Sequence, residues 1–539
     1  MENAPANRGN PPRRPSPLTS PPQPSAQREL LRLLRGAEAA WKQQDYQKSI
    51  DLIEQASRAD PSNPSILLNL ARAYGLRYNY AAAERSIERA VQVSSRRTET
   101  LAEAGLNCLE FQHLDMAIRY LGRASRAKDV SVGTLITLAD IYVREARFDD
   151  AADLVAHARQ LDRHDPRVRL REATLRRHAG KSEEAESILR ALRANPGAAG
   201  PAGEAIRLRA LFELGALLDR AGRYDEAMAA LFEAKAIQRT RPAHRAAILR
   251  LMRDRAIEME RTITADVLDR WRAGAAQLRP PRRIALLCGH PRSGTTLLEQ
   301  VLDAHTDIVS AEETRMMHDE AYLPIMRDVP EDAGIRESLD AASPDLLCHA
   351  RENYFGCTER YIQKPIGGRL LIDKNPGLNG MIPIFVRVFP EAKFLVPLRD
   401  PRDVVVSCFM LPDLQLAPTT SAYLSIEGTV QDYAAEMGFW LAMQPRLDAG
   451  QWMQVRYEDL VDDLPGTARA TLSFLGVAYE DSVLKFHEHA RTKRVKSPTR
   501  ADVVKPLYRT AMGRWRNYQK YLDPYMKDLE RFLKAFGYE

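Results

Sequence analysis

Small and large apolar residues recur every 34 positions through the first half of the chain. A column of small residues runs Ala56, Ala90, Ala124, Ala158, and a column of large aliphatic residues runs Ile53, Ile87, Leu121, Val155, Leu189. Small side chains let two helices approach closely, and the large ones fill the remaining gaps. A fixed period of this length predicts stacked helix pairs, each of which buries its apolar face only against its neighbours.

The 34-residue period resembles the tetratricopeptide repeat (TPR), whose unit is a helix–turn–helix. The resemblance implies about six repeats over residues 29–238, wound into an α-helical superhelix. Its concave face is expected to dock a protein or peptide, and a dimerisation or spacer role is the alternative. Residues 1–28 are rich in Pro and Arg and are predicted to be a disordered tail. Residues 239–280 stay helical outside the 34-residue frame and are interpreted as a connecting helix and linker.

The second half opens with a strand, a glycine loop and a helix. The short apolar run at 283–288 predicts a buried parallel strand, and the residues from Leu297 onward have helical spacing. The loop between them can cradle a phosphate with backbone N–H groups and the helix N-terminus. It is nearly a Walker A loop, but Thr295 stands where the lysine should be and the cation is Arg292. A triphosphate hydrolase would be handicapped, whereas a donor with one phosphate and a transferable sulfuryl group would not.

Further apolar runs end in polar residues and extend the predicted parallel sheet. Residues 370–376 form one such run, 393–403 another and 454–460 a third. In the second of these runs, Arg399 comes at the strand end and Ser407 follows eight residues later on a helix. An Arg fork and a Ser hydroxyl suit a second phosphate, although an ion pair of Arg399 with a nearby aspartate is the alternative. Residues 281–539 are therefore predicted to be a P-loop-like α/β domain.

The loop sequence Pro-Arg-Ser-Gly-Thr-Thr-Leu resembles the 5′-phosphosulfate loop of sulfotransferases. It is most similar to that of tyrosylprotein sulfotransferases and of bacterial proteins that fuse TPR repeats to such a domain. The resemblance implies 3′-phosphoadenosine 5′-phosphosulfate (PAPS) as donor, the bisphosphate PAP as product, and no metal. Its implied nucleotide contacts are Arg292, Ser293, Gly294, Thr295 and Thr296 at the 5′-phosphate, Arg399 and Ser407 at the 3′-phosphate, Tyr457 near the adenosine, and Lys505 and Arg514 at phosphates.

The same resemblance implies the residues that carry out the reaction. The segment Glu-Glu-Thr-Arg implies Glu313 as the base that takes the acceptor proton, and Arg315 as a residue facing the acceptor. Lys374 would stabilise charge on the bridging oxygen, together with Arg292. Without the resemblance, the two glutamates of this segment would be read as caps of a helix beginning near residue 314. The transition-state hydroxyl falls on Ser497 or Thr499, and the choice between them is open.

Composition narrows the class of protein. The 78 basic and 72 acidic residues leave a net charge of +6, which suits a polyanionic small molecule better than nucleic acid. Five scattered cysteines without a CxxC pair predict neither disulfides nor zinc, and they favour a reducing compartment. No apolar run is long enough to span a membrane, and the first residues do not read as a secretory signal. A cytoplasmic protein without membrane or nucleic-acid partners is therefore expected, with a homodimer left open.

The acceptor is the least determined part of the prediction. A tyrosine of a protein or peptide is favoured, because the motifs match tyrosylprotein enzymes and a repeat array could present a peptide. A carbohydrate or small-molecule hydroxyl is the second choice. A TPR scaffold with a non-catalytic, nucleotide-sensing domain is an alternative of another class, and a nucleotide kinase is a third, although it lacks the loop lysine. The full set of expected site residues argues against a decayed enzyme.

Overall fold

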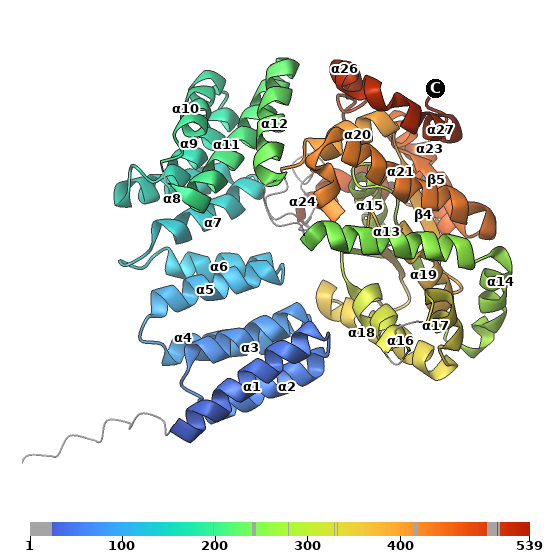
Figure 1. Ribbon diagram of the computed structural model, residues 1–539, viewed down its shortest axis with the longest axis horizontal. Helices are drawn as coiled ribbons and strands as arrows, with labels where there is room; N and C mark the ends of the chain where they lie inside the picture. The colour runs from blue at the N-terminus through green and yellow to red at the C-terminus, as the bar shows by residue number, and fades with distance from the viewer. Residues whose placement is uncertain are drawn as a thin grey trace, which may run out of the picture. The chain divides into compact units, whose positions relative to one another are not determined.

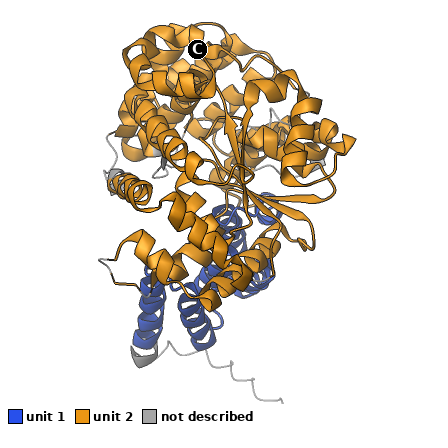
Figure 2. Cartoon of the chain, turned by 90° about the vertical axis from the view of Figure 1, so that its right-hand side faces the viewer, with its two compact units in different colours: residues 1–127 blue, residues 128–539 orange. Residues whose placement is uncertain are grey.

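A computed structural model describes residues 24–197, 199–239, 244–278, 280–327, 329–330, 333–412, 419–492, 504 and 507–539. The chain divides into two compact units, residues 1–127 and residues 128–539 (Figure 2). The first unit holds the first helix pairs of the repeat array. The second unit holds the remaining pairs together with a domain built on one β-sheet, so these two parts pack as one body.

The first half of the described chain is a series of six helix pairs (Figure 1). Their bounds are α1 (Pro24–Lys42) and α2 (Tyr46–Ala59), α3 (Pro64–Leu76) and α4 (Tyr80–Val93), α5 (Arg97–Glu110) and α6 (Leu114–Ala124), α7 (Val132–Arg144) and α8 (Phe148–Leu161), α9 (Pro166–His178) and α10 (Ser182–Ala194), α11 (Gly200–Arg220) and α12 (Tyr224–Arg239). The predicted helical repeat array is confirmed. Helix α1 begins at Pro24, inside the stretch that the sequence assigned to the tail.

The backbone repeats with the same period as the sequence. The turn inside each pair contains one residue in the left-handed region, and these residues are Gln44, Tyr78, Gln112, Ala146, Gly180 and Gly222. They are 34 positions apart except for the last, which follows after 42 because of the insertion before α11. The small residues of the repeat columns are fully buried where the helices meet. At Gly105 a Cβ would lie 2.5 Å from Leu121 Cγ, so α5 and α6 touch only because that side chain is absent.

The second half contains a five-stranded parallel sheet in the order β2-β3-β1-β4-β5. The strands are β1 (Ile284–Leu287), β2 (Ile308–Glu312), β3 (Leu370–Lys374), β4 (Lys393–Leu398) and β5 (Trp452–Arg456). The first four are buried in the core. The apolar runs of the sequence predicted β1, β3, β4 and β5, whereas β2 was not predicted. These strands confirm the α/β domain with a parallel sheet.

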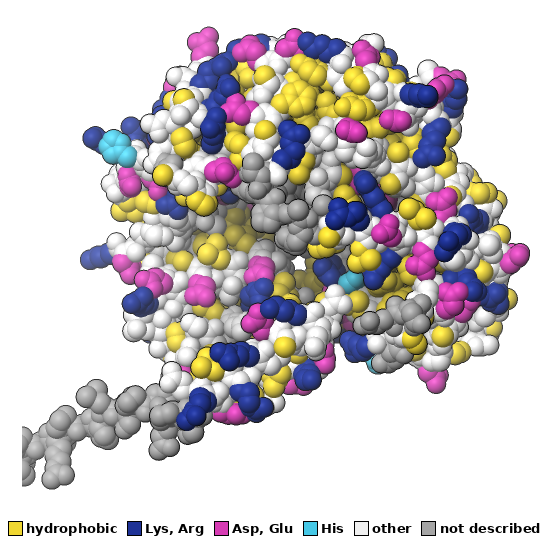
Figure 3. Space-filling view, in the orientation of Figure 1, with side chains coloured by type: hydrophobic (Ala, Val, Ile, Leu, Met, Phe, Trp, Pro, Cys, Tyr) yellow, Lys and Arg dark blue, Asp and Glu magenta, His cyan; other side chains and the backbone are white. Residues whose placement is uncertain are grey.

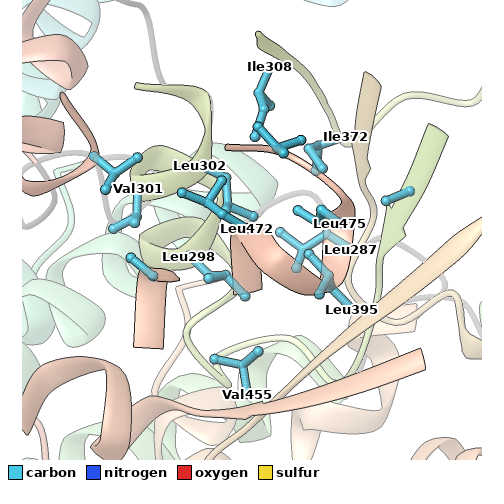
Figure 4. Close-up of a cluster of buried hydrophobic side chains, with 14 of the residues drawn as sticks. Leu287, Leu298, Val301, Leu302, Ile308, Ile372, Leu395, Val455, Leu472 and Leu475 are labelled. Atoms are coloured by element: carbon cyan, nitrogen blue, oxygen red, sulfur yellow. The ribbon is translucent and has the colours of Figure 1, made fainter. Parts of the chain in front are cut away.

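Helices cover both faces of the sheet. Their bounds are α13 (His244–Thr262), α14 (Ala265–Ala273), α15 (Thr295–Asp303), α16 (Leu323–Arg327), α17 (Ile335–Ala341), α18 (Pro344–Ile362), α19 (Ile382–Val388), α20 (Pro401–Phe409), α21 (Ile426–Met443), α22 (Tyr457–Asp462), α23 (Leu464–Leu475), α24 (Phe486–Thr492), α26 (Gln519–Leu522) and α27 (Met526–Phe536). On one face α15 and α23 bury Leu298 and Leu472 against Leu287 and Ile372 (Figure 4). On the other face α18 and α19 supply an aromatic cluster that includes Tyr354 and Phe389.

Figure 3 shows basic and acidic side chains intermixed over the visible face. Among the described residues, no helix combines the length and apolar character that crossing a membrane requires. None of the five cysteines, all of which lie within the described residues, forms a disulfide.

Candidate active site

The carboxyl ends of the five strands bring the predicted site residues to one edge of the sheet. Lys374, the last residue of β3, is paired with Leu287 on one side and with Glu312 on the other. Leu398 at the end of β4 is paired with Arg456 at the end of β5. Parallel strands direct all these ends to the same side, where ligands of open α/β sheets bind. The glycine loop and the polar residues after β2, β3, β4 and β5 therefore surround one site.

The glycine loop after β1 is fixed by hydrogen bonds from the chain around it. The Gly289 amide donates to Asn379 Oδ1 at 2.8 Å, and the Gly289 carbonyl accepts from the Gly377 amide at 2.7 Å. The Ser293 amide and hydroxyl both donate to the His290 carbonyl, at 3.3 and 2.7 Å, so that residue closes the loop's own turn. Helix α15 then begins with Gly294 as N-cap, which supplies no capping side chain. Its positive end therefore faces the site.

Gly294 is needed for two reasons. Its φ of 94° lies in the left-handed region, and a Cβ there would be 2.6 Å from the Tyr457 ring. The predicted adenosine neighbour Tyr457 thus packs directly on the predicted phosphate loop.

Pro397 shows how an interior strand of the sheet tolerates a proline. Strand β4 pairs with β1 only up to Leu395, whose carbonyl accepts from the Cys288 amide. Pro397 comes two residues later on the same side of the strand, beyond the end of β1, where no ladder partner needs its missing N–H. The glycine loop passes close to β4 at this point, since a Cβ on Gly289 would lie 2.9 Å from the Pro397 carbonyl oxygen.

The two predicted phosphate sites are directly connected. Arg292 Nε donates to Ser407 Oγ at 2.9 Å, which joins the loop to helix α20. Arg399 Nη1 donates to the Arg292 carbonyl at 3.3 Å. The Arg399 guanidinium also lies 5.1 Å from the Tyr457 ring centroid. Four residues that the sequence assigned to the nucleotide thus contact one another.

Arg399 keeps one buried donor unmatched. Its Nε has no hydrogen-bond partner in the described part of the chain. The side chain is 9% exposed and lies 3.6 Å from Asp403, so the ion pair that the sequence left open also forms. A buried N–H group without an acceptor costs free energy. An anionic group that accepts a hydrogen bond from Arg399 Nε would remove this cost, so the position favours anion binding.

Glu313, the predicted base, forms an ion pair with Lys374, the residue predicted to stabilise charge on the bridging oxygen. Lys374 Nζ donates to Glu313 Oε1 at 2.7 Å, and the Glu313 amide donates to the Lys374 carbonyl at the same distance. Lys374 is fully buried, whereas the Glu313 side chain is 45% exposed. Glu313 also has a φ of 50°, an uncommon backbone state for a residue that is not glycine. The next helical turn begins only at Met317, so Glu313 does not cap a helix.

A second, buried set of groups lies behind this ion pair. Lys374 Nζ is 3.8 Å from Glu312 Oε2, and Gln300 bridges Glu312 to Glu299 with distances of 3.4 and 2.6 Å. Burial by itself lowers the pKa of Lys374, but the carboxylates of Glu313, Glu312 and Glu299 together raise that pKa above its usual value. Lys374 is therefore a cation in this site. The sequence did not predict Glu299 or Gln300, because residues on the inner face of α15 read as ordinary helix positions.

The remaining predicted site residues have other surroundings. Arg315 is 65% exposed and lies 3.4 Å from Asp319. Arg514 Nη2 donates to both carboxylate oxygens of Asp219, a residue of the repeat array. Lys505 and the two candidates for the transition-state hydroxyl, Ser497 and Thr499, lie outside the described residues.

Further buried titratable groups lie in the glycine loop and next to the residues that bond to it. His290 Nε2 is 3.6 Å from Asp432, and the Glu436 carboxylate accepts from the Asn379 amide at 2.7 Å. Burial of His290 opposes its protonation, but Asp432 and Cys408 raise its pKa to about 10. Burial raises the pKa of Glu436 to about 7. Within the described ranges, no group of three or more His, Cys, Asp or Glu side chains is arranged to hold a metal ion.

Comparison with known families defines the class of protein. Residues 285–481 match the model of the sulfotransferase family, and residues 34–97 match that of the tetratricopeptide repeat. The C-terminal part of the chain thus matches the sulfotransferase family, and the beginning of the helical array matches the tetratricopeptide repeat.

Individual relatives are distant. An uncharacterized protein of Aquifex aeolicus is 26% identical over 338 residues, which is 61% of this chain and 42% of the relative. Protein-tyrosine sulfotransferase 1 of Danio rerio is 27% identical over 236 residues, 42% of this chain and 64% of the relative. The chain therefore spans less than two thirds of either protein. The sulfotransferase domain of a Synechococcus olefin synthase covers 44% of this chain and 88% of its own, with 22% identity and a TM-score of 0.32.

Proposed function

We propose that this protein transfers a sulfuryl group from PAPS to the phenolic hydroxyl of a tyrosine in a protein or peptide. The observation that carries the proposal is the hydrogen bond between Arg292 and Ser407, with Arg399 beside it. It holds together two anion-binding elements from different parts of the chain, as a nucleotide with separate 5′ and 3′ phosphates requires.

The residues present fit such a donor. The N-terminal end of α15 and the Arg292 side chain offer donors and positive charge to the 5′-phosphosulfate. The unmatched Arg399 Nε and the Ser407 hydroxyl offer donors to the 3′-phosphate. Tyr457, packed against Gly294 and Arg399, offers an aromatic face near the adenosine. Thr295 in the place of the Walker lysine disfavours a triphosphate.

The chemistry follows from the charges at the strand ends. The acceptor oxygen attacks sulfur in line with the leaving oxygen, its proton passes to a Glu313 carboxylate oxygen, and the bond between sulfur and the bridging oxygen breaks. PAP is the leaving group, and Lys374 and Arg292 stabilise the negative charge that develops on its oxygen. Catalysis of this kind depends mostly on positioning and on charges already in place.

The Glu313–Lys374 ion pair has a role in this scheme. While it is formed, the hydrogen bond from Lys374 Nζ occupies Glu313 Oε1, the oxygen that would otherwise be available to the acceptor. Approach of the donor's bridging oxygen to Lys374 would compete with Glu313 for the ammonium group and free the carboxylate for the acceptor. The buried Glu312 keeps the ammonium charged and in place during that exchange.

Support for a tyrosine acceptor comes from the relatives that carry the name protein-tyrosine sulfotransferase and from the exposure of Glu313 and Arg315. An acceptor residue of a macromolecule can reach a half-exposed base. The repeat array is proposed to dock that protein or another partner on its concave face.

Calorimetric titration with PAP and, separately, with ATP–Mg²⁺ tests the donor. We expect micromolar binding of PAP, no comparable binding of ATP–Mg²⁺, and loss of PAP binding in Arg399→Ala. Arg283→Ala is the matched control, because Arg283 precedes β1 at the opposite edge of the sheet in an exposed ion pair with Asp307. Preference for ATP–Mg²⁺, or no PAP binding by the wild type, would overturn the proposal.

The acceptor is tested next with labelled PAPS. Incorporation of label into tyrosine-containing peptides that disappears when the tyrosine is replaced by phenylalanine would support the protein acceptor. Label found only on carbohydrate or small-molecule hydroxyls would overturn it while leaving the donor assignment intact.

A further inference from the structure

The last helix pair of the repeat array contacts the C-terminal segment, residues 511–521. Arg514 Nη2 donates to Asp219 Oδ1 and Oδ2 at 2.8 and 2.7 Å, and the Tyr518 hydroxyl donates to Oδ1. Asp219 lies near the end of α11 and its side chain is 18% exposed. The Tyr518 ring also packs edge-on against Tyr224 at the start of α12. A single carboxylate of the array therefore holds two side chains of this segment.

The same segment is attached on its other side to the predicted 3′-phosphate site. Asp403 on α20 accepts from the Gly513 amide at 2.7 Å and from the Trp515 amide at 2.8 Å. Arg399 Nη2 donates to the Ala511 carbonyl. The orientation of the Arg399 guanidinium thus depends on where this short stretch of backbone lies.

The contacts alternate along the chain. The backbone at 511, 513 and 515 bonds to Arg399 and Asp403, while the side chains of Arg514 and Tyr518 bond to Asp219. Gly513 has a φ of 69°, which allows the backbone to turn between these two sets of bonds. The segment is therefore clamped between α20 and the repeat array, with a charge-assisted bond on the array side.

From this geometry we infer that Asp219 of the repeat array is a positioning residue for binding of the donor nucleotide. It acts through Arg514 and the backbone of the C-terminal segment on Arg399, and it does not touch the nucleotide. The inference rests on the proposed function, because Arg399 is the residue that it positions. It makes the last repeat part of the sulfotransferase site in addition to any docking role of the array.

The chain offers a matched control in the same pair of helices. Asp225 on α12 bonds to Lys520 at 2.7 Å and to the Tyr521 hydroxyl at 3.0 Å, later in the same segment. Its side chain is 68% exposed, and its partners follow the residues that bond to Asp403. Exposed ion pairs of this kind contribute little to stability. Asp225→Ala removes a carboxylate between the same two elements without touching the connection to Arg399.

The test compares PAP binding by wild type, Asp219→Ala and Asp225→Ala, using the full chain. We expect the dissociation constant for PAP to rise roughly tenfold in Asp219→Ala, the size of one charge-assisted hydrogen bond, and to stay unchanged in Asp225→Ala. The KM for PAPS should rise with kcat nearly unchanged. Hydrogen exchange at the Gly513 and Trp515 amides should be faster in Asp219→Ala before ligand is added.

The outcomes separate the inference from the proposed function. If the wild type does not bind PAP, the proposed function fails. If it binds PAP and Asp219→Ala binds equally well, the inference fails alone. If Asp219→Ala lowers the melting temperature, Asp219→Asn is measured as well, because it keeps an acceptor for Tyr518 but lacks the charge that holds Arg514. Binding losses that only follow the loss of folded protein in both variants would make Asp219 purely structural and overturn the inference.

Discussion

Replacement of Lys374 by methionine should destabilise the sheet as well as abolish catalysis. The lysine is fully buried, and it is 3.8 Å from Glu312, whose side chain is 3% exposed. Methionine has a similar length and fills the space, but it leaves the buried carboxylate without its cation. The expected loss of stability therefore comes from Glu312 and not from a cavity.

The magnitude follows from the separation of the two charges. At 3.8 Å and an effective dielectric constant of about 20, two unit charges attract by about 4 kcal/mol. Loss of one partner of a buried ion pair costs about 3–5 kcal/mol, which agrees with this figure. Glu313 is closer, at 2.7 Å, but it is 45% exposed, and solvent-exposed pairs contribute about 0–1 kcal/mol. Glu312 should account for most of the loss.

Hydrogen exchange at β3, combined with urea unfolding, measures the effect in wild type, Lys374→Met, Glu312→Gln and the double variant. We expect the double variant to recover most of the loss, because Glu312, the buried carboxylate 3.8 Å from the lysine ammonium group, then no longer carries a charge. Its sulfuryl-transfer activity should stay absent. Wild-type protection in Lys374→Met, or a double variant as unstable as the single one, would refute the reasoning.

Three further predictions concern the loop, the base and a buried carboxyl group. Gly294→Ala should lower the melting temperature and weaken PAP binding at least tenfold, roughly the cost of a left-handed alanine pressed against Tyr457, whereas Gly122→Ala, with no atoms within 4 Å of the new Cβ, should do neither. Glu313→Gln should lower kcat about 10²–10⁴-fold with PAP affinity unchanged by calorimetry, and unchanged turnover would remove it as the base. Burial raises the pKa of Glu436 to about 7 from 4.5, so its bound proton stabilises the folded state fully below pH 4.5 and this contribution is lost as the pH rises through 7. In urea unfolding at several pH values, Glu436→Gln should therefore gain about 3 kcal/mol relative to wild type between pH 4.5 and 8, and a difference that does not change with pH would contradict the assignment.

The parts of the fold that could be predicted are those that depend on patterns within a short stretch of sequence. The array was predictable because each repeat packs against an adjacent repeat, so one period in the sequence encodes both the helices and their contacts. The left-handed turn residues at Gln44, Tyr78 and Gln112 show the same period in the backbone. The unit of β1, glycine loop and α15 was predictable because its strand, turn and helix follow one another directly in the sequence.

The surroundings of the site residues were not predictable in the same way. The sequence singled out Lys374 and Glu313, but it did not show that Glu299 and Gln300 lie behind them on α15. It assigned Arg514 to the phosphates and did not indicate its bond to Asp219, 295 positions earlier. Both relations depend on which helix faces come together after the chain folds.

The sequence by itself determined the kinds of element, their order, and the residue types at the ends of the strands, because hydrophobic period and glycine placement act over a few residues. Only the tertiary structure decided which of these residues meet. The parallel register places Lys374 beside Glu312, and packing of α11 against the C-terminal segment places Asp219 at Arg514. Burial then sets the charge of each group, since the pKa of a side chain depends on the neighbours and the solvent that the complete fold leaves around it.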